Sequence, residues 1–285
     1  MRVLVFGAGG QLGRELVGLR SRPHEVTGLT RAECDIAQPG AAAAALQAHH
    51  PGAVINCAAW TKVDAAETQR DDAFRANALG PRLLAEACRD AEVLLCHIST
   101  DYVFDGTATA PIPEDAPTHP VGVYGESKLA GEEAIRATTP QHQIVRTSWL
   151  YGQDGPNFVL TMLRLGAERE ELRVVADQRG APTWTGHLAP ALLRLLDHAM
   201  PGTYHLTNSG ETTWCDFARA IMADAHLPAR VLPTTTAEYG APAPRPAYSV
   251  LDNAAWRALE EPPLPAWENG LQAYLVRRQV ARHIG

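Results

Sequence analysis

Positive charge is scarce in this sequence. Its 285 residues include 25 Lys and Arg against 32 Asp and Glu, which gives a formal net charge of −7. Because nucleic-acid binding depends on a basic face that contacts phosphates, this balance argues against a nucleic-acid partner. Small phosphate ligands are compatible with it, since one or two arginines and a helix N-terminus can hold them.

Long hydrophobic runs and closely spaced cysteines are also missing. The apolar run in MRVLVFGAGG is too short for a signal peptide, and no later run reaches the roughly 18 residues of a membrane span. The histidines form no H-x-x-x-H or Cys/His cluster, so we expect no histidine metal site. Dispersed cysteines without C-x-x-C spacing indicate reduced thiols in a cytoplasmic protein: Cys34, Cys57, Cys88, Cys96 and Cys215.

Short β-branched runs alternate with helical segments through the first half of the chain. This alternation predicts an α/β fold with a doubly wound, Rossmann-like parallel sheet. The predicted buried strands are 2–7, 24–30, 53–59, 93–100 and 142–152, and the predicted helices between them are 11–20, 40–49, 71–89 and 125–138.

The pattern loosens after about residue 150. A proline-rich stretch at 233–253 is predicted to be an ordered loop or a mobile flap, with neither helix nor strand. The remaining predicted elements are short strands at 172–178 and 203–208 and helices at 157–168, 186–199, 214–225 and 266–281.

A glycine-rich turn follows the first predicted strand directly. Gly7, Gly10 and Gly13 have G-x-x-G-x-x-G spacing there. Gly7 would allow a sharp turn, Gly10 would let backbone N–H groups reach a pyrophosphate, and Gly13 would let the helix pack close. Such turns also occur for packing alone, but the N-terminal position favours a dinucleotide site. Residues 1–150 are therefore predicted to form a dinucleotide-binding domain, and residues 151–285 mainly a smaller substrate-binding lobe with segments returning to the main domain.

The acid that would bind the ribose hydroxyls of NAD is missing at the end of the second predicted strand. The chain reads Leu29-Thr30-Arg31, and the next acids are Glu33 and Asp35. Thr30 and Arg31 would instead accept a 2′-phosphate, which favours NADPH, with NADH as a second possible cofactor. The alternative is a solvated Arg31.

Polar residues end the fourth predicted strand. Ser99, Thr100, Asp101 and Tyr102 lie at the edge of the sheet where a substrate would meet the nicotinamide. The alternative is a turn that satisfies only its own backbone.

Tyr124 and Lys128 stand four residues apart, on one face of a predicted helix. A carbonyl that receives hydride becomes an alkoxide and needs a proton donor. Tyrosine has a pKa of about 10, so a nearby ammonium is needed to lower it. Lys128 would supply that charge and hold the nicotinamide ribose, and Thr100 would donate a hydrogen bond to the same substrate oxygen.

The glycine turn, the Ser-Thr-Asp strand end and the Y-x-x-x-K pair resemble the extended short-chain dehydrogenase/reductase family. Further stretches resemble the branch of that family that reduces dTDP-4-dehydrorhamnose: NCAAWTKVDAAE, STDYVFDG, VYGESKLAGEEA, IVRTSWLYG, NFVLTMLRL, DQRGAPTW and RPAYSVLDN. The resemblance implies NADPH-dependent reduction of the C4 ketone of dTDP-4-dehydro-6-deoxy-L-mannose to dTDP-L-rhamnose, with hydride from the nicotinamide and a proton from Tyr124.

The resemblance also implies binding roles for single positions. In the proline-rich stretch, Arg245 would contact the dTDP pyrophosphate, unless it is a surface arginine. The cofactor would meet Gly10, Gln11 and Leu12 at its pyrophosphate, Asp35 and Ile36 near its adenine, and Ala58, Ala59, Trp60 and Thr61. The sugar nucleotide would meet Val63, Thr100, Asp101, Tyr102, Tyr124 and Trp149.

Relatives that bind Mg²⁺ at a dimer interface use an acid at the position of Glu15 and another just after GAPT. Here that second stretch reads WTGHL, residues 184–188, without a carboxylate. We therefore expect no metal site, a Glu15 that is a helix-surface charge, and a monomer or a weak homodimer.

Asn77 lies on the apolar side of its predicted helix, and Pro81 has no N–H to donate to its carbonyl. In this superfamily such an asparagine offers a free carbonyl to a water of the proton relay. We expect Pro81 to keep this carbonyl free; the alternative is a kink without function.

Two other functions stay open. A related reductase of NDP-4-keto-6-deoxyhexoses in natural-product biosynthesis would share every motif and differ in stereochemistry and pocket shape. A non-catalytic, cofactor-binding regulatory subunit would keep the fold but typically lose the tyrosine, the lysine or the strand-end threonine, all of which are present here.

Overall fold

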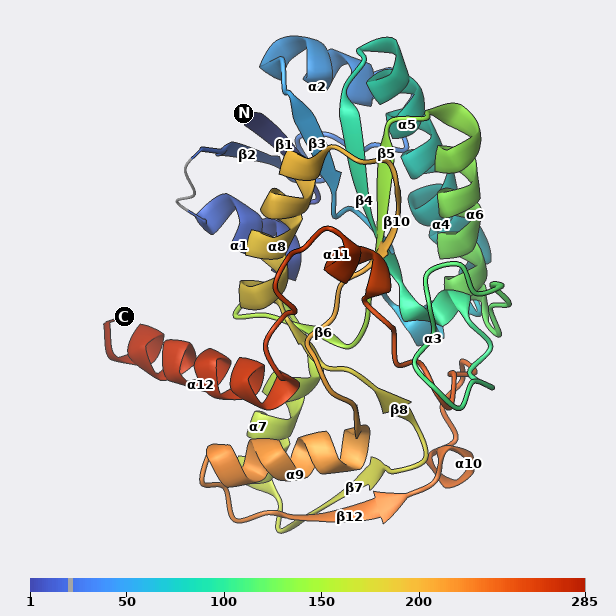
Figure 1. The fold of residues 1–285 in the computed structure, drawn as a ribbon. Coiled ribbons are helices and arrows are strands. Elements are labelled where there is room, and N and C mark those ends of the chain that lie inside the picture. The colour runs from blue at the N-terminus through green and yellow to red at the C-terminus, as the bar shows by residue number, and fades with distance from the viewer. Residues whose placement is uncertain (20–22, 285) are drawn as a thin grey trace.

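Six parallel strands form the central sheet of this computed structural model, which describes residues 1–19 and 23–284. The strand order is β10-β5-β4-β3-β1-β2, so the order reverses between β1 and β3 (Figure 1). This arrangement confirms the predicted doubly wound α/β fold. The strands are β1 Arg2–Phe6, β2 Glu25–Leu29, β3 Ala53–Asn56, β4 Leu94–Thr100, β5 His142–Thr147 and β10 Gly202–His205.

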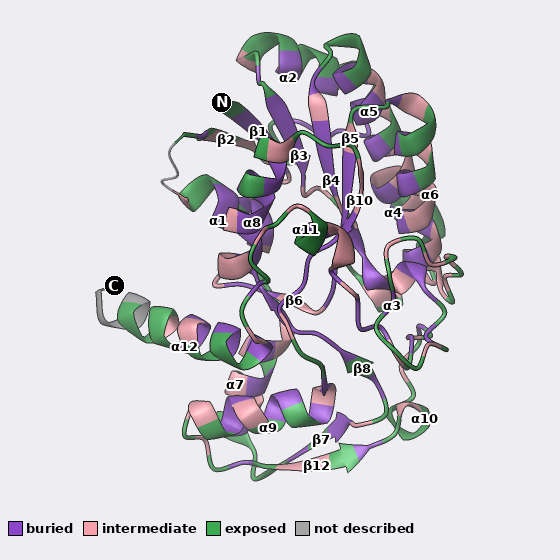
Figure 2. Cartoon of the chain, viewed as in Figure 1, coloured by how far each residue is buried: buried purple, intermediate pink, exposed green. Residues whose placement is uncertain are grey.

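Both faces of the sheet are buried, which explains the continuous apolar run of β1. Val3 and Val5 point into one hydrophobic cluster, and Leu4 and Phe6 point into another on the opposite face. Figure 2 shows the resulting buried strands between exposed helix surfaces. The first face is covered by α1 (Gln11–Gly18) and α8 (Thr185–His198), and the second by α2 (Ala41–His49), α5 (Gly80–Asp90) and α6 (Val123–Thr138).

The predicted helix 71–89 is divided into three parts. It begins as α4 (Arg70–Phe74), widens into a π-helical turn η1 (Arg75–Leu79) and continues as α5. Pro81 has no N–H to donate to the carbonyl of Asn77, as a regular α-helix would require. Asn77 lies within the widened turn. A Cβ on Gly131 of α6 would lie 2.1 Å from the Asn77 carbonyl oxygen. The widened turn therefore packs its backbone directly against α6.

The C-terminal lobe is built around aromatic side chains. Tyr151, Phe217, Trp267 and Tyr274 belong to one buried cluster beneath the main sheet. In Figure 1 the last helix, α12 (Trp267–Ile284), projects from the side of the molecule. The other elements are α7 Phe158–Glu168, α9 Trp214–Asp224, the parallel pair β7 Glu171–Val175 and β12 Arg230–Thr234, and the short pairs β6 Leu150–Tyr151 with β9 Thr183–Trp184 and β8 Arg179–Gly180 with β11 Thr212–Thr213.

The prediction that 233–253 contains neither helix nor strand is wrong. Pro233 lies in β12, which pairs with β7 alone, so the missing N–H can face away from the ladder. The helix α10 (Thr236–Tyr239) follows and is capped at its N-terminus by a capping box between Thr235 and Glu238. Three short helices were not predicted: α3 Val63–Ala66, η2 Asp101–Val103 and α11 Ala254–Ala258.

Several predicted boundaries also shift. The predicted strand 142–152 is two strands, β5 and β6, and β2 is only partly buried because it lies at the sheet edge. The predicted helix 11–20 ends at Gly18, and residue 20 lies outside the described residues. β10, from the C-terminal half, pairs with β5 of the main sheet. The division into residues 1–150 and 151–285 stays a prediction.

The five cysteines are all free. Within the described part of the chain, no helix combines the length and the apolar character that a membrane crossing needs.

Candidate functional site

The turn after β1 can be made only by glycine at two positions. Gly7 has φ +80°, and a Cβ there would lie 2.5 Å from the Ala58 nitrogen. A Cβ on Gly13 would lie 2.3 Å from the Gly7 carbonyl oxygen. Gly10 is the N-cap of α1 and has no side-chain cap. The amides of the first turn of α1 are thus free to meet an anion.

A cavity of about 390 Å³ lies beside this turn, at the carboxyl ends of β1 and β3. It therefore occupies the point where the strand order reverses, which is the ligand site of doubly wound sheets. Predicted cofactor residues in its wall are Gly7, Gly10, Arg31, Asp35, Ile36, Ala58, Ala59 and Trp60; the other wall residues, for which no cofactor contact was predicted, are Gly9, Cys34, Cys57, Asp72, Arg75 and Ala76.

Two arginines converge on one carboxylate in the cavity wall. Arg75 Nη2 lies 3.1 Å and Arg31 Nη2 lies 3.7 Å from Asp35 Oδ2. These ion pairs and the amide of Ala37 together hold the pKa of Asp35 below its usual value, against the effect of partial burial. The Thr30 hydroxyl, in contrast, donates to Glu33. Arg75 was missed because it reaches the cavity from η1, far along the chain.

Gln11 and Leu12 face away from a ligand at the glycine turn. The Leu12 side chain is part of the buried core between the sheet and α8. Gln11 Nε2 donates to the Pro156 carbonyl, and Gln11 Oε1 accepts from Asn157. Only the backbone of these two residues is placed to contact a pyrophosphate, while the Gln11 side chain links α1 to the lobe.

A single buried amide connects the cavity wall to α6. Asn77 accepts from the Trp60 amide at 2.8 Å and donates to the Trp60 carbonyl and to the Ser127 hydroxyl. The Ser127 hydroxyl in turn donates to the Tyr124 carbonyl. Asn77 therefore fixes the loop after β3 relative to the helix that carries Tyr124. The relay role of its carbonyl stays a prediction.

Polar groups at the end of β4 gather next to Tyr124. The Thr100 hydroxyl donates to Asp101 Oδ1 at 3.0 Å and accepts from the Tyr102 amide. Burial raises the pKa of Asp101 to about 6, opposed by hydrogen bonds from Ser249 and Thr100. The Tyr102 and Tyr124 rings meet edge-on, with centroids 5.5 Å apart.

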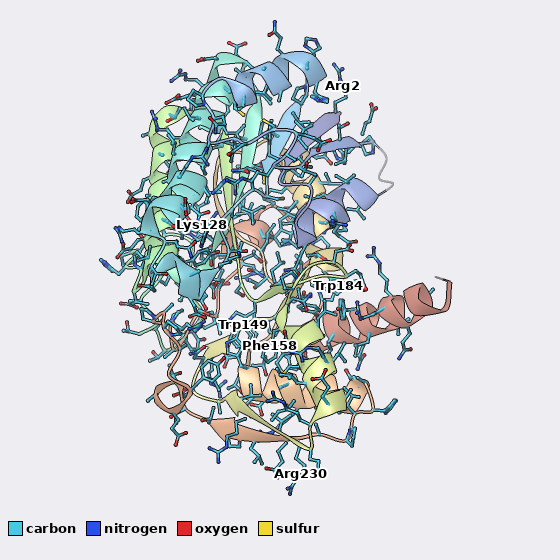
Figure 3. All side chains as sticks on the ribbon, turned by 180° about the vertical axis from the view of Figure 1, so that it is seen from behind. Arg2, Lys128, Trp149, Phe158, Trp184 and Arg230 are labelled. Carbon is cyan, nitrogen blue, oxygen red and sulfur yellow. The ribbon has the colours of Figure 1, made fainter. Side chains whose placement is uncertain are left out.

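Burial raises the pKa of Tyr124 to about 12, and the Asp101 charge acts in the same direction, while a hydrogen bond with Thr100 lowers it. Lys128 is buried and directed elsewhere: its Nζ donates to the Ile98 carbonyl at 2.7 Å and lies 3.3 Å from His97 Nε2. The predicted lowering of the Tyr124 pKa by Lys128 is therefore absent from this arrangement. Figure 3 labels Lys128 between the sheet and α6.

Trp149 and Arg245 both take part in built contacts. Trp149 has φ +45° and stacks on Trp214 with centroids 3.5 Å apart; Figure 3 shows it beside Phe158 at the junction with the lobe. Arg245 makes a two-pronged ion pair with Asp64 of α3 at 2.9 and 3.0 Å. It also hydrogen-bonds Tyr102. It is thus not the free surface arginine that was the alternative.

The prediction that Glu15 is a helix-surface charge is wrong. Its carboxylate is buried, because Arg277 from α12 donates to Oε1 and the Thr185 hydroxyl lies 3.4 Å from Oε2. The ion pair joins residues from the two ends of the chain, so no local pattern could predict it. Through this ion pair, α12 is attached to α1, the helix that follows the glycine turn.

Curated relatives match almost the whole chain. A dTDP-4-dehydrorhamnose reductase from Streptomyces griseus is 48% identical, over 95% of this chain and 91% of its own length. A probable dTDP-4,6-dihydroxy-2-methyloxan-3-one 4-ketoreductase from Streptomyces antibioticus is 47% identical, over 95% and 94%.

Solved structures agree with these relatives. A dTDP-4-dehydrorhamnose reductase from Clostridium acetobutylicum superposes with a TM-score of 0.95 at 42% identity, over 98% of this chain and 100% of the other. One from Bacillus anthracis, in complex with NADP, gives 0.94 at 40% identity, over 97% and 99%. The family described as RmlD substrate binding domain matches residues 1–280. The chain belongs to this RmlD substrate binding domain family.

Proposed function

We propose that this protein reduces the C4 ketone of dTDP-4-dehydro-6-deoxy-L-mannose with NADPH and so forms dTDP-L-rhamnose in the cytoplasm. The observation that carries the proposal is the meeting of Thr100, Tyr124 and Tyr102 at the end of β4. Relatives and solved structures of similar length and fold bear the name of this reductase.

The residues at the sheet edge fit a dinucleotide. The amides at the start of α1 meet a pyrophosphate, and the cavity wall beside Asp35 meets the adenosine half. Arg31 and Arg75 favour NADPH because two guanidinium groups near one point suit a 2′-phosphate. The Bacillus anthracis structure contains NADP. When bound, the cofactor supplies the hydride.

Proton transfer falls to Tyr124. Its high pKa keeps the phenol protonated at neutral pH, as a proton donor requires. Thr100 lies beside the phenol and, once its hydroxyl turns from Asp101, donates to the same substrate oxygen as negative charge develops. Lys128 holds the nicotinamide ribose and, once charged and turned toward the phenol, brings the pKa of Tyr124 closer to the working pH.

The nucleotide sugar is bound between the end of β4 and the lobe. Trp149 packs against the sugar, supported from behind by Trp214. Val63, Asp101 and Tyr102 line the same side, and Arg245 contacts the diphosphate. For Arg245 this requires exchange of its ion pair with Asp64 for a pair with the ligand.

A second function has its own support. The Streptomyces antibioticus relative is named a 4-ketoreductase of a different dTDP-sugar, at nearly the same identity as the Streptomyces griseus reductase. The same site geometry serves a related 4-keto-6-deoxyhexose, since the residues proposed for proton transfer and cofactor binding would be the same. The quaternary structure proposed is a monomer or a metal-independent homodimer, because Arg277 occupies the Glu15 carboxylate.

One assay separates these functions. The purified protein is given dTDP-4-dehydro-6-deoxy-L-mannose with NADPH or NADH, nicotinamide oxidation is followed, and the product sugar is identified by NMR. We expect dTDP-L-rhamnose, with a higher kcat/KM for NADPH. Turnover of only a differently configured 4-ketosugar would support the second function, and no turnover by folded protein with any of these substrates would reject both.

A further inference from the structure

Behind the proposed catalytic pair, three buried polar side chains form a chain that ends at Lys128. Lys128 Nζ lies 3.3 Å from His97 Nε2, and His97 Nδ1 lies 3.0 Å from Asn56 Nδ2. Asn56 and His97 are fully buried on the adjacent strands β3 and β4, where they are paired neighbours. None of the roles proposed above uses His97 or Asn56.

The orientation of Asn56 is fixed by its own loop. The Ala58 amide donates to Asn56 Oδ1 at 3.0 Å, and a backbone N–H can only donate. The Asn56 atom that faces His97 is therefore the NH2 group, which is also only a donor. It follows that His97 Nδ1 must accept, and that the proton of the neutral imidazole is on Nε2.

This tautomer places a donor in front of Lys128. An ammonium has three donors and no acceptor, so a charged Lys128 would face the Nε2–H of His97 donor to donor. A neutral amine, in contrast, can donate to the Ile98 carbonyl and accept from His97 Nε2 at the same time. We propose that His97, oriented by Asn56, is a positioning residue that favours the neutral amine of Lys128 over its ammonium in the ligand-free enzyme.

The surroundings agree with this assignment. Burial lowers the pKa of Lys128 to about 8, although Glu132 on α6 and Cys57 after β3 act to raise it. The Glu132 carboxylate is fully engaged by Arg146, Arg136 and Ser99, which limits its hold on Lys128. Burial keeps the pKa of His97 well below its usual value, and a charged Lys128 lowers it further, so the ring is neutral in either state of the lysine.

The consequence for catalysis rests on the proposed reductase function. Lys128 must gain a proton before it can act as the cation beside Tyr124, and gaining it requires His97 to release its hydrogen bond. Activity is then lost as pH rises through the pKa of Lys128, and His97 sets where that loss occurs.

The sequence allows a direct test, since Lys62 and Lys128 are its only lysines. Protein labelled with ¹³C at lysine Cε gives two signals, and Lys62→Arg identifies the one from Lys128. We expect Lys128 to titrate about two pH units below the usual lysine value of about 10.4. His97→Gln, which can offer an oxygen to an ammonium, should raise the Lys128 midpoint by about one unit or more.

His97→Phe is the matched control, because it keeps a buried ring without a donor or an acceptor. Its Lys128 midpoint should rise by less than in His97→Gln, because the Nε2–H donor is lost but no oxygen replaces it and the site stays buried. An unchanged midpoint in both variants would overturn the proposal.

A second measurement needs no variant that could fail to fold. Long-range ¹H–¹⁵N spectra of the wild-type imidazoles should show His97 as the Nε2–H tautomer at pH 7. A Nδ1–H tautomer would overturn the proposal. The pH at which kcat/KM falls should move with the Lys128 midpoint in His97→Gln. If the Lys128 midpoint shifts as expected but the wild-type protein has no reductase activity, the hydrogen-bond assignment holds and the proposed function is rejected.

Discussion

The glycines of the nucleotide half and those of the lobe are required for different reasons. At Gly7, Gly13 and Gly131 an added Cβ would meet backbone atoms of a neighbouring segment, at 2.1 to 2.5 Å. At Gly180 and Gly186 it would meet the rings of Trp149 and Trp184, both at 2.4 Å. At these positions the nucleotide half is held by main-chain contact, which cannot yield, and the lobe by side chains, which can repack.

This difference assigns separate tasks to the two regions. Backbone contacts fix the glycine turn and α6, where the proposed cofactor site and the proposed proton donor must keep their geometry to a fraction of an ångström. Aromatic side chains shape the proposed sugar side, and the relatives are named for different dTDP-sugars. Four predictions test this separation, from the largest expected effect to the smallest.

Tyr124→Phe tests whether the chemistry belongs to the nucleotide half alone. We expect kcat to fall by about 10²–10⁴-fold, because only the proton donor is lost. The Kd for NADPH, measured by fluorescence titration, should change by less than about twofold. Near-normal turnover in this variant would remove the role assigned to the hydroxyl.

Gly131→Ala and Gly180→Ala compare the two kinds of contact directly. The first should reduce the free energy of unfolding by about 3 kcal/mol, since its Cβ meets the Asn77 carbonyl, which is held by the widened helix. The second should cost about 1 kcal/mol and raise the KM for the sugar nucleotide, as the Trp149 ring moves aside. Urea denaturation measures the free energy of unfolding of both variants, and equal losses of stability would contradict the comparison.

Asp101→Asn tests the border between the regions, where Ser249 meets the end of β4. The folded-state pKa of Asp101, about 6, exceeds the usual 3.8, so the folded protein binds the extra proton. Wild-type stability therefore falls as pH rises from about 4 to about 6. Asp101→Asn should remove about 2 kcal/mol of that fall, with pH-dependent thermal unfolding as the readout. Parallel pH profiles of both proteins would show that Asp101 does not titrate in this range.

Arg75→Ala tests the proposed cofactor preference. We expect the Kd for NADPH to rise about tenfold, because one guanidinium no longer meets the 2′-phosphate, and the Kd for NADH to stay within about twofold. Arg31→Ala is the matched control on the same carboxylate and should have a smaller effect, since Arg31 is the more exposed partner of Asp35. An equal rise in the Kd for NADPH and for NADH would show that Arg75 contacts a part of the cofactor other than the 2′-phosphate.

Local spacing predicted what is local in the structure. Gly7 and Gly13 act within one strand–helix turn, and Tyr124 and Lys128 lie one turn apart on α6, so the sequence specified both. Arg75 could not be predicted in this way. It reaches Asp35 from the widened turn η1, whereas the pattern of residues 71–89 predicted a regular helix without such a turn. The buried pairing of Glu15 with Arg277 depends on a contact between opposite ends of the chain. The direction of Lys128 depends on His97, whose position in β4 shows no motif.

The widened turn at Arg75–Leu79 has a consequence for how this family could vary. A π-helical turn accommodates one residue more than an α-helical turn, so the residues before and after it are offset by about 100° around the helix axis. Loss of a single codon within this turn would restore a regular helix and rotate Arg75 relative to Pro81. Arg75 could then no longer face the cavity while the Asn77 carbonyl faces Gly131. Length, as well as composition, is therefore under constraint in this segment.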